Sequence, residues 1–208
     1  MALFEQGYCF IAGLDEAGRG CLAGPVVAAA VMLPLEKGAE TLSELLRGVN
    51  DSKQLSEATR ESLYDRIMQE ALAVGVGIGS VELIERYNIL QATKRAMRVA
   101  LDQLSPAPQA LLLDALTLPN LTLPQRSLIK GDARSLSIAS ASIIAKVTRD
   151  RLMRELHQEY PEYGFDRHKG YGTEAHIAAI KQYGATPHHR KTFSPIREML
   201  YGLFADFE

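Results

Sequence analysis

Four acidic side chains share one feature, because each follows a short apolar run of the kind that forms a buried strand. The acids are Asp15, Glu16, Asp114 and Asp132. The expected strands cover residues 8–12, 110–114 and 127–132. If these strands are neighbours in one sheet, the carboxylates converge at one edge, and open α/β sheets bind ligands at the carboxyl ends of their strands. The sequence therefore predicts an acidic site at a sheet edge.

The chemistry of such a site follows from its ligand atoms. Like charges are costly to bury side by side unless a cation neutralises them. Carboxylate oxygens without clustered Cys or His favour a hard cation, Mg²⁺ or Mn²⁺, over Zn²⁺. Two such ions about 3.5–4 Å apart can align a water, bind a phosphate and stabilise the leaving oxygen of an in-line displacement. The alternative, which explains Asp114 or Asp132 taken alone, is that each caps a helix or a turn.

A glycine-bracketed arginine, Gly18-Arg19-Gly20, comes directly after the first acidic pair. Glycine accepts positive φ and lets another molecule approach the backbone closely. The spacing indicates a loop beside the acids that a ligand can reach. A strand that simply ends in a polar turn is the alternative interpretation.

Composition bounds the class of protein. The chain has 208 residues, of which 47% are hydrophobic and 23% charged, as in an ordinary globular protein. We expect one domain, and no apolar run is long enough to span a membrane. Residues 126–191 hold 12 basic and 7 acidic side chains, whereas the net charge of the whole chain is −2. This positive segment is either a phosphate-binding face or solvated surface.

The elements that must position these residues can be outlined from apolar periodicity. Further strands are expected at 26–33 and at 73–79, where glycines indicate close packing beneath a helix. Helices are expected around 42–47, after Ser56, over 81–104 with a break near Asn88, over 133–160, after Thr173 and over 194–207. Within 133–160 the first half is apolar and should be buried, and the second half, 149–159, is charged and should emerge into water.

Several segments together resemble bacterial ribonuclease HII. The matching segments are residues 15–20 (Asp-Glu-Ala-Gly-Arg-Gly), 50–55 (Asn-Asp-Ser-Lys-Gln-Leu), 130–132 with 139–150, 168–173 and 188–190. The resemblance covers about residues 8–198 in the right order. It departs from the family pattern at Cys21, where proline is usual, and at Ala115, where glycine is common.

The resemblance implies an α/β, RNase H-like fold. We expect a mixed five-stranded sheet flanked by helices, with residues 1–208 forming a single catalytic domain whose helical C-terminal part covers about 160–208. It implies a ribonuclease H that cleaves the RNA strand of RNA–DNA hybrids and incises on the 5′ side of single ribonucleotides in duplex DNA. The products implied are a 3′-hydroxyl and a 5′-phosphate.

Matching motif positions carry over the family's site residues. Asp15, Glu16, Asp114 and Asp132 would bind the divalent metal, Mn²⁺ or Mg²⁺. The Gly18-Arg19-Gly20 loop would sense the ribose 2′-hydroxyl, which distinguishes RNA from DNA at one nucleotide. Tyr171, between glycines in a polar loop, would pack on the sugar beyond the RNA-to-DNA junction; a plain packed or surface tyrosine is the alternative.

Basic residues near these motifs are candidates for phosphate contacts, namely Lys53, Lys146 and Arg149. Lys146 and Arg149 are equally explained as helix-surface charges, and Lys146 is spaced to pair with Asp150. His168, His188 and His189 lack the pattern of a zinc site and are interpreted as phosphate contacts or surface. Cys9 and Cys21 are expected to be free thiols in a reducing cytoplasm.

Two rival functions remain at this stage. Ribonuclease HIII has a Gly-Thr-Gly-type loop and an extra N-terminal domain, whereas Arg19 is present here and few residues precede the first strand. A non-catalytic nucleic-acid-binding module would make all four acids spectators. The expected partners are RNA–DNA hybrids and ribonucleotide-containing duplex DNA. We expect the protein to act as a monomer and not to bind a membrane. A sliding-clamp interaction is not supported by a clear motif, although Phe204 and Phe207 leave room for one.

Overall fold

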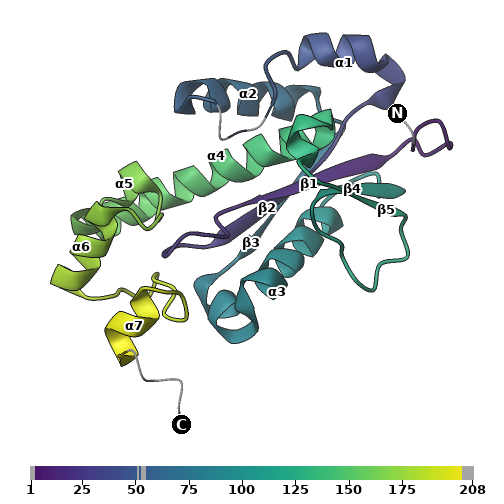
Figure 1. The fold of residues 1–208 in the computed structure, drawn as a ribbon. Helices are drawn as coiled ribbons and strands as arrows, with labels where there is room; N and C mark the ends of the chain where they lie inside the picture. The colour runs from purple at the N-terminus through teal and green to yellow at the C-terminus, as the bar shows by residue number, and fades with distance from the viewer. Residues whose placement is uncertain (1–2, 51, 53–54, 203–208) are drawn as a thin grey trace.

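The computed structural model describes residues 3–50, 52 and 55–202, and its core is one sheet between two layers of helices (Figure 1). The elements in chain order are β1 (Ile11–Ala17), β2 (Val26–Met32), η1 (Leu35–Lys37), α1 (Ala39–Leu45), α2 (Glu57–Glu70), β3 (Ala73–Gly79), α3 (Val81–Asp102), β4 (Ala110–Asp114), β5 (Gln125–Leu128), η3 (Gly131–Ala133), α4 (Leu136–Glu159), η4 (Pro161–Tyr163), α5 (Phe165–His168), α6 (Glu174–Tyr183) and α7 (Ile196–Tyr201). The expected mixed five-stranded sheet with flanking helices and a helical C-terminal part is confirmed.

The strand order is β3-β2-β1-β4-β5. β1 pairs antiparallel with β2 and parallel with β4, and β5 continues the parallel side. Every residue of β2 is buried, as expected of a strand that is apolar on both faces. Because β1 lies at the centre and β4 runs parallel to it, the acidic ends of both strands meet at the same edge.

The two faces of the sheet bury different helices. On one face α3 packs against alternate residues of β1, β2 and β4, among them Leu14, Ala28 and Leu113. On the other face α4, α1 and α2 cover residues such as Ala29 and Val31. The alternation follows from the period of two in a strand.

The expectation that the glycines of β3 lie beneath a helix is confirmed. A Cβ on Gly75 would lie 2.0 Å from the carbonyl oxygen of Ala100, and one on Gly77 would lie 1.9 Å from that of Ala96. Any side chain at these positions would push α3 off the sheet. The break in α3 at Asn88, where φ is 67°, is also confirmed.

Several boundaries differ from those expected. β1 begins at Ile11 and continues through Glu16, so the first two acids lie within the strand rather than beyond it. β5 ends at Leu128, because Lys130 takes a left-handed φ of 54° and turns the chain. Asp132 therefore lies in the short η3 turn, and α4 starts at Leu136 rather than at residue 133.

The C-terminal part is a small second core. Tyr163, Phe165, Ile180 and Ile196 pack with Leu22 in the segment that follows β1. The closing helix, α7, is shorter than the expected 194–207, and residues 203–208, with Phe204 and Phe207, lie outside the described residues. No helix in the described part of the chain is long and apolar enough to cross a membrane.

Candidate active site

Asp15 and Asp114 are carried side by side at one edge of the sheet. Leu14 of β1 pairs with Leu113 of β4 in a parallel register, so the two aspartates are the next residues on neighbouring strands. β4 ends at Asp114, whereas β1 continues to Ala17 through its antiparallel pairing with β2. This is the edge of an α/β sheet at which ligands bind.

The Asp15 carboxyl group is the most perturbed acid of the site. Its residue is 7% exposed. Burial, followed by the nearby charges of Glu16 and then Asp114, raises its pKa to about 7, although hydrogen bonds from Ser142 and from the Glu16 backbone N–H oppose that rise. The three acids are thus close enough to repel one another, and a cation among them would relieve this repulsion.

Glu16 and Asp114 already have partners. Arg19 Nη1 lies 3.0 Å from Glu16 Oε1, which places the exposed arginine of the Gly18-Arg19-Gly20 loop against the acid pair. Asp114 Oδ1 accepts a hydrogen bond of 2.8 Å from the Gly131 N–H. The turn that carries Asp132 is therefore tied to the end of β4.

Asp132 is less closely integrated than the other three acids. Its Oδ1 accepts from the N–H of the next residue, Ala133, at 2.9 Å, but it does not cap the η3 turn, whose N-cap is Lys130. Among the described residues, no three His, Cys, Asp or Glu side chains form a ready-made metal-binding group. The structure brings Asp15, Glu16 and Asp114 together and places Asp132 on the adjoining turn. The donors all carry oxygen, which fits Mg²⁺ or Mn²⁺.

The loop after the acids packs on two buried arginines. Gly18 has φ 95°, and a Cβ on it would lie 2.0 Å from Arg149 Nε, so only glycine fits. Arg190 donates to the carbonyl oxygens of Gly18, Arg19 and Gly24. Gly20, by contrast, is exposed, and a Cβ there would meet nothing within 4 Å. The two arginines thus hold the buried side of the loop, and its other side, at Gly20, is open to solvent.

Arg149 is not a surface charge, and the expectation that helix α4 enters water from this residue onward is wrong for its first turn. Arg149 is 0% exposed and donates to the carbonyl oxygens of Pro25, Lys169 and Ala23. A guanidinium carries five donors, which suits it to join three backbone segments. The proposed phosphate contact by Arg149 gains no support from this burial.

The histidine-rich turn is also more buried than expected. His189 is fully buried; its Nε2 lies 3.1 Å from Nε2 of His176, and its Nδ1 bonds to Thr186. Burial lowers the pKa of His176 to about 4 and that of His189 to about 3, with further lowering of the latter by neighbouring histidines. His189 is therefore a neutral core residue, and the interpretation as surface or phosphate contact is wrong for it.

Tyr171 lies across from Lys146. The tyrosine is 42% exposed, and the Lys146 ammonium lies 5.6 Å from the centre of its ring. Burial raises the pKa of Tyr171, and Cys21 beside its hydroxyl raises it further. Cys21 is a buried free thiol and Cys9 an exposed one. Lys146 also pairs with Asp150 at 2.7 Å, which confirms the pairing indicated by their spacing.

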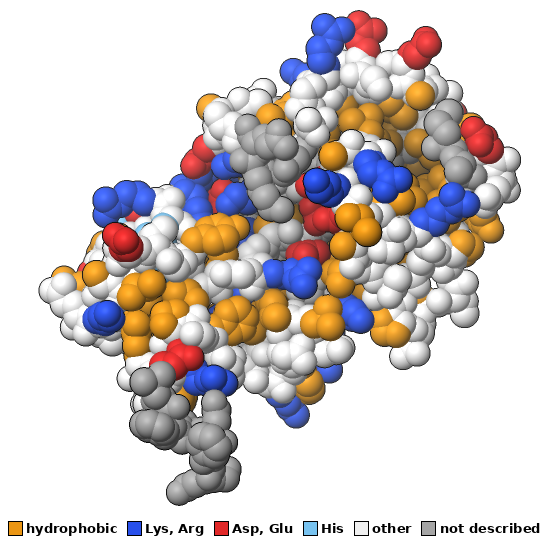
Figure 2. Space-filling model, in the orientation of Figure 1, with side chains coloured by type: hydrophobic (Ala, Val, Ile, Leu, Met, Phe, Trp, Pro, Cys, Tyr) orange, Lys and Arg blue, Asp and Glu red, His pale blue; other side chains and the backbone are white. Residues whose placement is uncertain are grey.

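The charges around this edge are mixed on one face of the molecule. Figure 2 shows acidic side chains near the middle of the face with Lys and Arg side chains close on either side. Lys53, one of the residues expected to contact phosphate, lies outside the described residues.

Reasoning from sequence assigned no role in the site to five residues that support it. They are Arg60, Ser142, Asp150, Lys169 and Arg190. Ser142 and Asp150 lie in the segment 139–150, where a serine and a charge interrupt an apolar helix. A polar side chain at an otherwise buried helix position is the signal that could have identified them.

Known proteins resemble this chain over most of its length. The sequence profile of the ribonuclease HII family matches residues 12–196. The chain is 57% identical to ribonuclease HII of Bacillus cytotoxicus over 199 residues, covering 96% of this chain and 74% of the relative. It is 58% identical to the Halalkalibacterium halodurans enzyme, covering 94% and 72%.

Solved structures give the same fold. Ribonuclease H2 from Pyrococcus horikoshii has a TM-score of 0.74 at 32% identity, covering 91% of this chain and 96% of its own. The ribonuclease HII in a PCNA complex from Archaeoglobus fulgidus has a TM-score of 0.72 at 26% identity, covering 88% and 95%. A ribonuclease HIII solved with Mn²⁺ shares the fold at 21% identity and a TM-score of 0.67, covering 100% of this chain and 74% of its own.

Proposed function

Because the chain belongs to the ribonuclease HII family and is thus an endonuclease of the ribonuclease H class, we propose that it cleaves RNA in RNA–DNA hybrids and incises duplex DNA 5′ of single embedded ribonucleotides. The proposed products are a 3′-hydroxyl and a 5′-phosphate, and the cut begins ribonucleotide removal from DNA. The pair of aspartates on neighbouring parallel strands carries this proposal, since it supports a charged, hydrolytic site at the sheet edge.

Asp15, Glu16, Asp114 and Asp132 are the proposed ligands of Mg²⁺ or Mn²⁺. A bound divalent ion would neutralise the acids, orient an attacking water and stabilise charge on the phosphate. The chain's own part is to hold Asp15 between Ser142 and the Glu16 backbone, and Asp114 against the Gly131 N–H. These bonds fix the carboxylates before the substrate arrives.

The Gly18-Arg19-Gly20 loop is the proposed reader of the 2′-hydroxyl. Its carbonyls of Gly18 and Arg19 are held by Arg190, and Gly20 leaves space for a sugar edge. A site built to bond a hydroxyl rejects a substrate without it strongly, because its polar groups are then left unpaired. We assign Arg149 and Arg190 to positioning this loop, and Lys53 and Lys146 to phosphate contacts.

Tyr171 is the proposed contact for the sugar after the RNA-to-DNA junction. Its ring is half exposed in a glycine-flanked loop, with one side toward Lys146. An aromatic ring packs well on a deoxyribose, where a 2′-hydroxyl would crowd it. This contact would make the junction, rather than the base sequence, the feature that is read.

A cleavage assay on duplex DNA containing one ribonucleotide tests the proposal. We expect a single cut on its 5′ side with Mg²⁺ or Mn²⁺, and none with a chelator. An all-DNA duplex of the same sequence is the control. Cleavage at other positions, or cleavage that persists in the chelator, would contradict the proposed function. We propose no partner other than nucleic acid for this chain. The sliding-clamp complex belongs to the Archaeoglobus protein.

A further inference from the structure

A polar stripe runs along one face of α4, from its apolar first half into its charged second half. Ser142, Lys146, Asp150 and Arg154 are spaced by four residues and so lie one above another. All four contact groups outside the helix: Ser142 contacts Ser52, Lys146 faces the Tyr171 ring, and Asp150 and Arg154 pair with side chains of α2. Asp150, in the middle, is only 2% exposed.

Asp150 is held between two cations. Its Oδ1 lies 2.7 Å from Lys146 Nζ, and its Oδ2 lies 3.7 Å from Arg60 Nη2 of α2. A buried carboxylate needs such partners, because an isolated charge in the interior is very costly. The three side chains, Lys146, Asp150 and Arg60, together carry a net charge of +1.

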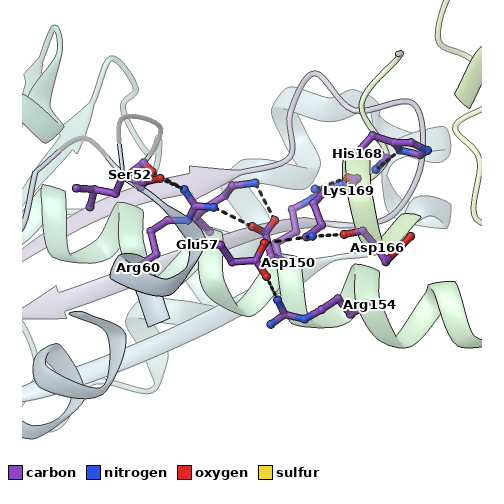
Figure 3. Close-up of polar contacts among 12 residues, drawn as sticks. Ser52, Glu57, Arg60, Asp150, Arg154, Asp166, His168 and Lys169 are labelled. Atoms are coloured by element: carbon purple, nitrogen blue, oxygen red, sulfur yellow. Dashed lines mark hydrogen bonds and ion pairs between the residues drawn. The ribbon is translucent and has the colours of Figure 1, made fainter. Parts of the chain in front are cut away.

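Each cation then reaches a different part of the site. Lys146 lies over the Tyr171 ring, 5.6 Å from its centre. Arg60 Nη1 donates to the carbonyl oxygen of Ser52 at 3.0 Å and to that of Leu55 (Figure 3). Asp150 therefore connects the tyrosine loop to the segment that precedes α2.

The same segment is linked back to the acids. Ser52 Oγ lies 2.8 Å from Ser142 Oγ, and Ser142 hydrogen-bonds Asp15. A second connection ties α2 to the tyrosine loop, because Lys169 Nζ lies 3.6 Å from Glu57 Oε2 (Figure 3). The polar contacts thus run from Asp15, around α4, to Tyr171.

We infer that Asp150 is a positioning residue that sets the Lys146 ammonium against the Tyr171 ring and so couples junction recognition to the metal-binding edge. This rests on the proposed function for its effect on cleavage, but not for its geometry. With Asp150 neutral, Lys146 loses its anchor and turns to solvent, and the tyrosine loses the cation that holds one side of its ring.

A spectroscopic experiment tests the geometry independently of cleavage. The chain contains no tryptophan, so Tyr171→Trp introduces a single tryptophan at the ring position, which can be excited without exciting the remaining tyrosines. We expect Asp150→Asn in this background to shift the emission maximum and to increase quenching by iodide. Glu61→Gln is the matched control, because Glu61 also joins α2 to α4, through Arg151 and Arg154, without contacting Lys146 or Tyr171. Unchanged emission in Asp150→Asn would overturn the inference even where cleavage is as proposed.

A cleavage experiment in the otherwise unmodified chain tests the coupling. We expect Asp150→Asn to lower kcat/KM on a duplex with one ribonucleotide about 10-fold more than on a long RNA–DNA hybrid, which has no junction at the cut. In a Tyr171→Ala background the same substitution should leave that ratio unchanged. An equal loss on both substrates, as a general structural defect would give, would overturn the coupling.

Lys146→Met keeps the test decisive if Asp150→Asn fails to fold. It removes the cation directly and should reproduce the emission shift in the Tyr171→Trp background. In the otherwise unmodified chain it should lower cleavage of both substrates, through the lost phosphate contact, and cleavage at the single ribonucleotide the more. A Lys146→Met protein with unchanged emission would refute the ring contact. If the unmodified protein does not incise at a single ribonucleotide at all, the proposed function fails, while the emission results still decide the position of Lys146.

Discussion

The acidic cluster at the sheet edge and the pair of buried arginines behind the loop differ in how their charges are compensated. At the sheet edge, burial together with the nearby charges of Glu16 and Asp114 raises the pKa of Asp15 to about 7. Behind the loop, Arg149 and Arg190 are both 0% exposed, yet their guanidinium groups are bonded to backbone carbonyls from several segments.

This difference in charge compensation distinguishes the acids, which form the proposed metal site, from the arginines, which support the loop. The acids repel one another, and Arg19 pairs with Glu16 alone, so a divalent cation bound among them would relieve the remaining repulsion. The arginines have already used their donors within the protein, and they give the chain its shape rather than its chemistry. A charged side chain therefore does not by itself indicate function. What distinguishes the two groups is how far hydrogen bonds and opposite charges within the protein compensate the charge.

Removing one acid should have the largest effect. Asp114→Asn keeps the shape and an oxygen that can accept from the Gly131 N–H, but it removes the charge of a proposed metal ligand. We expect cleavage to fall by about three orders of magnitude or more, since the metal contributes several kcal/mol of transition-state stabilisation. Substrate binding should persist, which a gel-shift titration would measure beside the cleavage rate. Retained activity would place Asp114 outside the metal site.

Removing a buried arginine should reduce stability instead of chemistry. Arg190→Met removes the guanidinium donor from the buried carbonyl oxygens of Gly18, Arg19 and Gly24, and we expect a loss of about 3 kcal/mol in the free energy of unfolding. Urea denaturation would measure it, with Lys191→Met, at the exposed neighbouring position, as the control. If the two variants unfold at the same urea concentration, the supporting role assigned to Arg190 is wrong.

Removing the aromatic ring should have a smaller, selective effect. Tyr171→Ala should reduce incision at a single ribonucleotide by about 10-fold to 100-fold while affecting overall binding less, because stacking contacts contribute about 1–3 kcal/mol. Comparing the incision rate at saturating enzyme with the dissociation constant separates the two effects. Parallel losses in binding and incision would refute the sugar-packing role.

The histidine pair predicts the smallest effect, a pH dependence of stability. Folding lowers the pKa of His176 and His189 from 6.5 to about 4 and about 3. The stability they contribute is complete above pH 6.5 and is lost as the pH falls, because the unfolded chain takes up protons first. We expect a loss of about 1 kcal/mol per histidine between pH 7 and pH 5.5.

Thermal unfolding over that pH range checks the prediction. His189→Asn should give a flatter pH dependence than the unmodified chain, although its stability at pH 7.5 is lower. His188→Asn, at the more exposed neighbouring position, is the control and should keep the original slope. An unchanged slope in His189→Asn would show that this residue does not titrate as its burial implies.

The sequence by itself determined the sheet, its acids and its family. Apolar runs that end in Asp or Glu define strands and their polar ends, and glycines at alternate positions of β3 mark where α3 lies close, because both signals are local in the chain. The left-handed conformation of Lys130 has no such local signal. It is the reason why Asp132 lies in a turn and not at the end of a strand as expected.

Only the tertiary structure decided which charges face water and which are buried. Arg149, Asp150, His189 and Arg190 belong to polar stretches of sequence and read as surface, yet they lie in the interior. Their partners are backbone carbonyls and side chains up to 172 positions away, as between Arg190 and Gly18. Burial of a charge depends on what distant segments supply to satisfy it, and that supply exists only once the chain has folded.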